Sequence, residues 1–169
     1  MYEGRPQLTT SDVRKIEAEI EERKLVIRPQ LIGEVKEARA QGDLSENFEY
    51  YAAKKAKNEN EGRIRYLERM LKTATVISDA SGEDEVGINN TVTLYFEEDE
   101  EEAVYKVVTS IRGNSLENRI SNESPIGKAI MGHRVGDRVQ VKANEDYSYY
   151  VVIRAIDKST GDDDDIKRF

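Results

Sequence analysis

Gly42-Asp43-Leu44-Ser45-Glu46-Asn47 is a turn-forming stretch between two long helix-forming segments, and it decides how the first half of this chain folds. A turn here would fold the two helices back on each other as an antiparallel hairpin. The carboxylates of Asp43 and Glu46 would then lie at its far end. Two carboxylates without a nearby His or Cys suit a hard divalent cation such as Mg²⁺. The sequence therefore predicts a helical arm with an acidic tip.

The same two acids also fit a purely structural role. Asp43 and Glu46 are three residues apart at a helix start, which is the spacing of an N-cap and its partner. Spacing alone favours this capping role over catalysis. Ser45 is an alternative cap for the second helix, and it would leave both acids free to face outward.

Each arm helix has its own sequence signals. Thr9 as N-cap with Asp12 three residues later predicts the start of the first helix, and Pro29 predicts a kink or break near Arg28. Apolar residues recur mostly every three or four positions, which predicts a narrow packing seam on each helix. The seam positions are Val13, Ile16, Ile20, Ile27, Leu31, Val35 and Ala38 in the first helix, and Tyr51, Ala52, Ala56, Ile64, Leu67 and Leu71 in the second.

The second half changes to β-strand patterns. β-branched and aromatic runs at 91–96, 103–108, 138–141 and 149–153 predict a small antiparallel sheet. Ser124 followed by Pro125, and Gly132 after them, predict one short helix. The fold class is therefore α+β. The expected divisions are an arm at 1–75, a sheet domain at 76–160 and an acidic, disordered tail at 161–169.

Composition and charge exclude several classes of protein. The 169 residues contain no cysteine, so disulfide frameworks and thiolate zinc sites are excluded. There is no long apolar run and no secretory signal pattern, so we expect a cytoplasmic protein without a membrane partner. Residues 1–75 hold 15 basic and 14 acidic side chains (net +1), whereas 76–169 hold 11 and 20 (net −9). Because the second half would repel a phosphate backbone, we do not expect independent duplex binding.

Several motifs together resemble the bacterial Gre family of transcript cleavage factors, its GreA-type members most of all. The matching segments are Arg28-Pro29-Gln30-Leu31-Ile32, the run from Glu37 to Tyr50, Ala52-Ala53-Lys54, the run from Ile120 to Ala129, and Val135-Gly136-Asp137. The resemblance covers nearly the whole chain. It departs at Phe48, where the family most often has Ala, and in the tail after Gly161.

The resemblance implies both an architecture and an activity. It implies a coiled-coil arm and an FKBP-like C-terminal domain in a monomer that binds the secondary channel of RNA polymerase. The expected function is to make the polymerase cleave backtracked RNA at its 3′ end. Asp43 and Glu46 would help hold a second Mg²⁺ and orient water in the polymerase active site, so the free protein would hold no metal and would not be an enzyme by itself.

The resemblance also assigns roles to further residues. Lys54 would contact the RNA, and Asn47 and Tyr50 would support the tip. Glu123, Ser124 and Pro125 would contact the polymerase. Two other functions stay open: an inhibitor of the polymerase with the same fold, and an FKBP-type prolyl isomerase. Retention of both tip acids disfavours the inhibitor. The absence of Trp and the presence of only three Phe disfavour an aromatic isomerase pocket.

Overall fold

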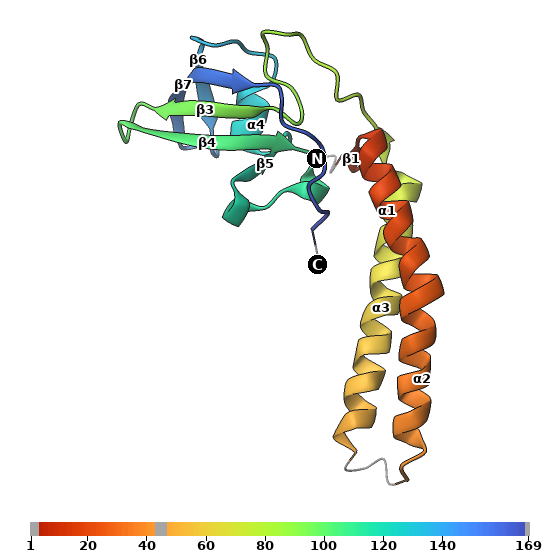
Figure 1. Cartoon of the computed structure of the whole chain (residues 1–169). Coiled ribbons are helices and arrows are strands. Elements are labelled where there is room, and N and C mark those ends of the chain that lie inside the picture. The colour runs from red at the N-terminus through yellow and green to blue at the C-terminus, as the bar shows by residue number, and fades with distance from the viewer. Residues whose placement is uncertain (1–3, 43–46, 168–169) are drawn as a thin grey trace. The chain divides into compact units, whose positions relative to one another are not determined.

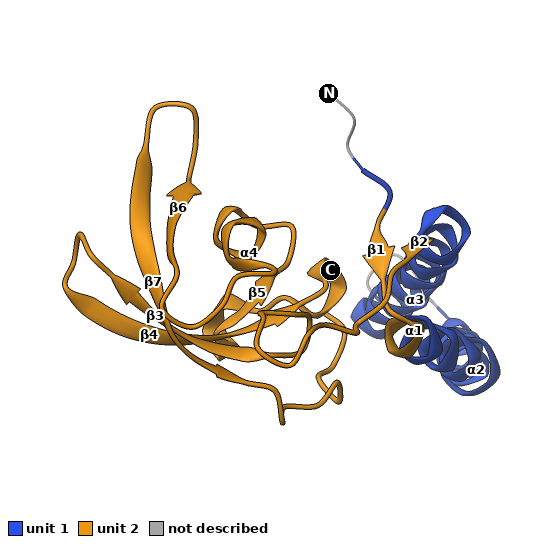
Figure 2. Cartoon of the chain, turned by 90° about the horizontal axis from the view of Figure 1, so that it is seen from above, with its two compact units in different colours: residues 1–5, 13–74, 169 blue, residues 6–12, 75–168 orange. Residues whose placement is uncertain are grey.

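A computed structural model of the chain describes residues 4–42 and 47–167. The chain divides into two compact units, coloured in Figure 2. The first comprises residues 1–5, 13–74 and 169, and its helical part, residues 13–74, is called the arm here. The second, called the sheet unit, comprises residues 6–12 and 75–168. Each unit is described by itself.

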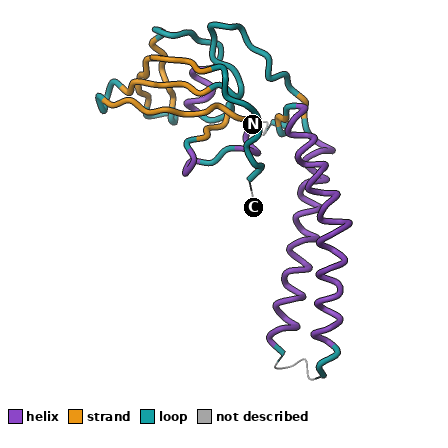
Figure 3. The backbone as a smooth tube through the Cα atoms, in the orientation of Figure 1, coloured by secondary structure: helices purple, strands orange, loops and turns teal. Residues whose placement is uncertain are grey.

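The arm is a helical hairpin, as the sequence predicted. Along its first leg, α1 (Thr10–Glu22) is followed by the π-helical turn η1 (Arg23–Ile27) and α2 (Arg28–Arg39), and α3 (Phe48–Thr73) returns beside them in Figures 1 and 3. Of the helices in the described residues, none is both long enough and apolar enough to span a bilayer.

The interruption in the first leg lies just before Pro29. The Arg28 N–H donates to the Arg23 carbonyl five residues earlier, so η1 is a single wide turn. Pro29 then lies in the first turn of α2 and has no N–H to donate to η1, where the hydrogen-bond pattern changes. The sequence predicted an irregularity near Arg28, and the structure places it in the preceding turn.

The helices of the arm pack through a mixed seam of apolar and charged side chains. Ile16 and Leu67 are fully buried, and Ile64, Ala38 and Tyr50 are nearly so. The predicted seam is wrong at the start of α3, where Tyr50 is buried and Tyr51 and Ala52 are exposed. Ion pairs join the two legs at the edges of the seam, with the guanidinium of Arg63 on Glu19 and that of Arg28 on Glu61.

The sheet unit contains a five-stranded sheet with the order β5-β4-β3-β7-β6. The strands are β3 (Thr91–Phe96), β4 (Glu101–Val108), β5 (Arg119–Ser121), β6 (Arg138–Lys142) and β7 (Ser148–Asp157). The sheet is mixed: β5 runs parallel to β4, and the other pairs are antiparallel. The expectation of an all-antiparallel sheet is therefore corrected, because the weak three-residue signal of β5 was not recognised.

The core of the sheet unit lies under the short helix α4 (Pro125–Ile130), which Figure 2 shows beside the sheet. Ile130 from α4 is fully buried among the inward-facing residues of the strands. The buried members of this core are Val86, Val92, Leu94, Val107, Ile130, Val139, Val141, Val151 and Ile153. Along β3 and β6, buried residues alternate with less buried ones, so the buried side chains of each strand share one face of the sheet.

Two segments from the ends of the chain belong to the sheet unit. β1 (Gln7–Leu8) pairs in parallel with β2 (Thr75–Val76), just before and just after the arm in sequence. Residues 161–167 have no regular secondary structure, but they hold specific contacts with this unit. These groupings differ from the expected divisions at 1–75 and 76–160 and from the expected disordered tail, because the contacts joining these segments are remote in sequence.

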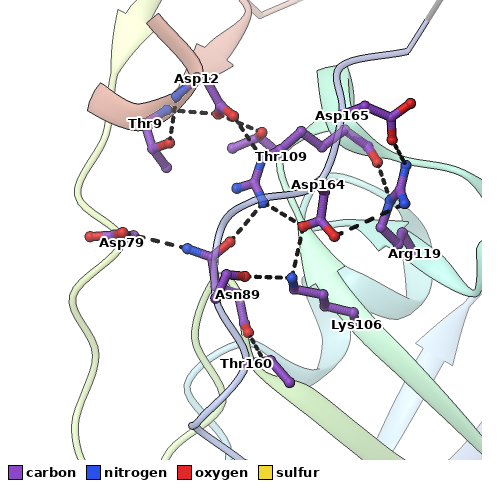
Figure 4. Close-up of polar contacts among 12 residues, drawn as sticks. Thr9, Asp12, Asp79, Asn89, Lys106, Thr109, Arg119, Thr160, Asp164 and Asp165 are labelled. Atoms are coloured by element: carbon purple, nitrogen blue, oxygen red, sulfur yellow. Dashed lines mark hydrogen bonds and ion pairs between the residues drawn. The ribbon is translucent and has the colours of Figure 1, made fainter. Parts of the chain in front are cut away.

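The contacts centre on the fully buried guanidinium of Arg112, in the 3₁₀ turn η2 (Ser110–Arg112). Its Nε donates to Asp12 at 2.7 Å and its Nη1 to Asp164 at 3.0 Å. Thr109 also donates to Asp12, at 2.6 Å. Figure 4 shows Asp12, Thr109 and Asp164 in this network, with Lys106 on Asp164 at 2.7 Å. Residues from both ends of the chain therefore meet in one polar cluster.

Asp164 is held in its charged form by this cluster. Burial raises the pKa of its carboxyl, but the hydrogen bond from Lys106 and the charges of Lys106, Arg112 and Arg119 outweigh that effect. The net result is a pKa below the usual value of a carboxyl group. The interaction therefore stabilises the folded unit at neutral pH, and that stabilisation is lost as the pH falls through the lowered pKa.

Candidate functional site at the tip of the arm

The described part of the tip is organised by Asn47. Its Oδ1 accepts a hydrogen bond from the Tyr50 N–H at 3.0 Å, so Asn47 is the N-cap of α3. Its Nδ2 donates to the carbonyl oxygen of Ala38 at 2.8 Å, near the end of α2. One side chain therefore both caps α3 and ties the ends of α2 and α3 together. Ser45, the cap that the sequence suggested for this helix, lies outside the described residues.

The backbone just after α2 adopts a conformation that favours glycine, and Gly42 occupies that position. Gly42 has φ +104°, in a region that L-residues rarely adopt, and its N–H donates to Arg39 at 3.3 Å. No atom lies within 4 Å of the position that a Cβ would occupy. The constraint at Gly42 is therefore the backbone angle and not crowding.

Tyr50 anchors the first turn of α3 against α2. It is buried, and the guanidinium of Arg39 lies over its ring at 5.8 Å from the centroid. A hydrogen bond with Arg39 and the charge of Lys54 lower the pKa of the Tyr50 phenol, against the opposing effect of burial. Lys54 is therefore close enough to Tyr50 to act on it, while its own side chain is exposed. The structure brings Asn47, Tyr50 and Lys54 together at one end of the arm.

The two predicted catalytic acids, Asp43 and Glu46, lie outside the described residues. Their roles stay a prediction. Within residues 4–42 and 47–167, no group of three or more His, Cys, Asp or Glu side chains is arranged to hold a metal ion. A groove of about 430 Å³ beside the tip is lined by alanines, Gln41 and the carboxylates of Glu34, Glu37 and Glu49.

Replacing Asn47 tests its double role. Asn47→Ala should destabilise the arm by about 1–2 kcal/mol, through loss of the cap and of the hydrogen bond to Ala38. Asn47→Asp keeps an acceptor for the Tyr50 N–H but loses the donor, so it should cost less. Urea unfolding followed by far-UV circular dichroism measures both. Equal stability of Asn47→Ala and the unmodified protein would show that this side chain does not stabilise the arm.

The predicted docking residues lie in the sheet unit, where they form the start of α4. Ser124 is its N-cap: its Oγ accepts from the Gly127 N–H at 3.1 Å and donates to the Ser121 carbonyl at 2.6 Å. Pro125 follows in the first turn and is exposed, and Glu123 accepts from Ser110 at 2.9 Å. The predicted helix start is confirmed. A docking role for Glu123, Ser124 and Pro125 stays a prediction.

Sequence reasoning missed Arg39, and it missed the difference between the two tyrosines. Arg39, at the end of α2, contacts Tyr50 at the start of α3, and no local sequence pattern signals this contact. Helical periodicity could have been extended back from Ile64 and Leu67 to separate buried Tyr50 from exposed Tyr51. The alanines around Tyr51 concealed that phase.

Comparisons with known proteins cover almost all of the chain. The family model described as "Transcription elongation factor, N-terminal" matches residues 6–76, and that described as "Transcription elongation factor, GreA/GreB, C-term" matches residues 81–158. The transcription elongation factor GreA of Streptococcus pneumoniae strain G54 is 41% identical over 160 residues, covering 94% of this chain and 99% of the relative. GreA of Streptococcus sanguinis strain SK36 matches to the same extent.

Solved structures that the chain matches include the transcription factor Gfh1, with 27% identity, a TM-score of 0.45, and coverage of 90% of this chain and 97% of the other. A GreA/GreB factor from Nitrosomonas europaea has 19% identity, a TM-score of 0.39, and coverage of 90% and 98%. On the family models and the sequence identities, the chain belongs to the GreA/GreB family of transcription elongation factors. Within that family it is GreA-like.

Proposed function

We propose that this protein is an elongation factor that stimulates the cleavage of backtracked RNA by RNA polymerase. The observation that supports it most is the 41% identity to GreA over 94% of the chain. The sequence around the tip adds to this, because Gly42 to Asn47 connect α2 and α3 at the end of the arm. In the proposal the tip enters the secondary channel of the polymerase and reaches its active site.

The proposed chemistry uses Asp43 and Glu46 as oxygen donors to a second Mg²⁺ in the polymerase. Such an ion would lower the pKa of the attacking water and stabilise charge on the scissile phosphate. Carboxylate oxygens are the ligands that Mg²⁺ prefers, so the donor set fits. Two carboxylates alone make a weak Mg²⁺ site, so the proposal places the ion in the complex, where the polymerase supplies the other ligands.

The described residues have supporting parts in the proposal. Asn47 and Tyr50 fix the start of α3 against the end of α2, so that the acids are presented from a rigid base. Lys54 is exposed near Tyr50 and would contact a phosphate of the 3′ end of the RNA. Glu123, Ser124 and Pro125 would contact the polymerase from the sheet unit.

The test is a cleavage assay with purified components. Added to polymerase halted in a backtracked complex, the full chain should release short 3′ RNA fragments and restore elongation. RNA with Mg²⁺ and the chain alone should stay intact, because the two carboxylates cannot assemble a two-metal site. Slower elongation without RNA fragments would indicate an inhibitor instead. Degradation of RNA without polymerase would contradict the assignment of the reaction to the polymerase.

A further inference from the structure

The first two turns of α3 present an outward-facing patch of aromatic and basic side chains. It consists of Phe48, Tyr51, Lys54 and Lys55, all of them exposed, and is called the tip patch here. Phe48 is 85% exposed and Tyr51 is 51% exposed. A phenylalanine so open to solvent contributes little to the folding of the arm, and with Tyr51 it leaves aromatic surface available for binding.

Helical spacing makes these four residues neighbours. Tyr51 is central: Phe48 precedes it by three residues, and Lys54 and Lys55 follow by three and four. The ring of Tyr51 meets that of Tyr50 edge to face, with 5.4 Å between centroids. Since Tyr50 is buried against α2, this contact gives Tyr51 a fixed support. The tip patch therefore has one anchored ring and one freely accessible ring.

Among the described residues, the charges around the tip patch are segregated. Within the described residues, neither Lys54 nor Lys55 forms an ion pair with an acidic side chain. The nearest acid in sequence, Glu49, lines the groove with Glu34 and Glu37 of α2. Glu59 lies one turn beyond Lys55 on α3. In the described part of the chain, the aromatic rings are thus accompanied by lysines without ion pairs, while carboxylates line the adjacent groove.

We propose that the tip patch binds the unpaired 3′ segment of the RNA, with one base stacked on Phe48 and phosphates contacted by Lys54 and Lys55. The inference rests on the proposed function and deepens it, because it makes Phe48, Tyr51 and Lys55 substrate-binding residues. Aromatic platforms beside cations are the usual means of holding single-stranded nucleic acid without reading its sequence. Lysine is depleted from protein–protein interfaces, whereas here two lysines lie beside the two rings.

Stacking has a specific physical signature that separates it from other contacts. It requires an aromatic ring on the protein and a base on the RNA, so removing either one should remove the same interaction. Removing both should cost no more than removing one. A contact between Phe48 and the polymerase would instead be lost with Phe48 regardless of the RNA.

The experiment combines variants of the full chain with backtracked complexes that carry either normal RNA or RNA with one abasic nucleotide in its 3′ segment, scanned position by position. The half-saturating factor concentration and the maximal cleavage rate are both measured. Phe48→Ala should raise the half-saturating concentration about tenfold on normal RNA, because it removes the stacking of one base. Phe48→Trp should retain binding, and Phe48→Leu should behave as Phe48→Ala.

At the abasic position that matches the stacked base, Phe48→Ala and the unmodified protein should become equivalent. Leu116→Ala is the matched control, since Leu116 is 93% exposed in the sheet unit and should have no effect. Melting curves of the Phe48 variants should match that of the unmodified protein.

The outcomes distinguish the two proposals. No cleavage with the unmodified protein would overturn the proposed function, and the inference with it. Three results would overturn the stacking inference and leave the proposed function intact. Phe48→Ala could behave as the unmodified protein, Phe48→Leu could keep full activity, or Phe48→Ala could show the same tenfold loss at every abasic position.

Discussion

Asp43→Asn and Glu46→Gln should each reduce stimulated RNA cleavage by roughly 100-fold or more, while polymerase binding is nearly retained. Outer-shell partners of metal ligands already cost 10–100-fold when mutated, and the proposal makes these acids ligands or water-orienting groups of the ion itself. Both substitutions keep the size of the side chain and remove its charge. The effect on folding should be small, because Asn47 provides the N-cap of α3.

The measurement is cleavage rate as a function of Mg²⁺ concentration at saturating factor. If the acids help to hold the ion, high Mg²⁺ should partly rescue both variants. Glu49→Gln is the matched control: it makes the same chemical change at an exposed position in the first turn of α3 and should cleave normally. Variants of Asp43 and Glu46 that cleave at the normal rate once saturating protein is bound would defeat the catalytic assignment.

Asp12→Ala and Arg112→Met should each destabilise the sheet unit by about 3–5 kcal/mol, a large share of the stability of a domain. Asp12 and Arg112 are both fully buried and joined at 2.7 Å, so removing one side chain leaves the other charge buried with fewer partners. Asp12→Ala also removes the acceptor for the Thr9 N–H. Urea unfolding followed by near-UV circular dichroism measures the change, because five of the nine tyrosines lie in the sheet unit (Tyr95, Tyr105, Tyr147, Tyr149 and Tyr150).

Two comparisons separate the ion pair from helix capping. Thr9→Ala removes only the hydroxyl that accepts a hydrogen bond from the Asp12 N–H at 3.2 Å. It should lower the free energy of unfolding by about 1 kcal/mol. The double variant, Asp12→Leu with Arg112→Met, should cost less than the sum of the single changes, because no charge from the Asp12–Arg112 pair is then left buried. Strict additivity would mean that the two side chains stabilise the unit independently.

Local signals in the sequence predicted much of this fold. Thr9 and Asp12 form the expected capping box, and Ser124 with Pro125 begins α4 as expected. Strands β3 and β6 were found almost to the residue, because period-two patterning is strong there. The hairpin was predicted from the turn-forming sequence Gly42 to Asn47.

Sequence reasoning failed where the structure depends on contacts between residues far apart in the sequence. Arg112 bonds to Asp12 across 100 residues and to Asp164 across 52, and nothing near any of them signals the pairing. The tail was therefore expected to be disordered, since a run of Asp residues without partners cannot pack. At the tip, the motif named the candidate acids, but only the hairpin contacts of Asn47 and Arg39 reveal what supports them.

The pairing of β1 with β2 means that the arm is an insertion. The chain departs from the sheet unit after Asp12 and re-enters it at Thr75. Gln7, shortly before the departure, and Thr75 are strand partners. An insertion whose two ends meet can be lengthened, shortened or exchanged without changing the register of the host domain. Each helical turn deleted from both legs would shorten it by about 5.4 Å. Reach and anchoring are therefore separable traits, open to independent change in evolution and to grafting of a different arm.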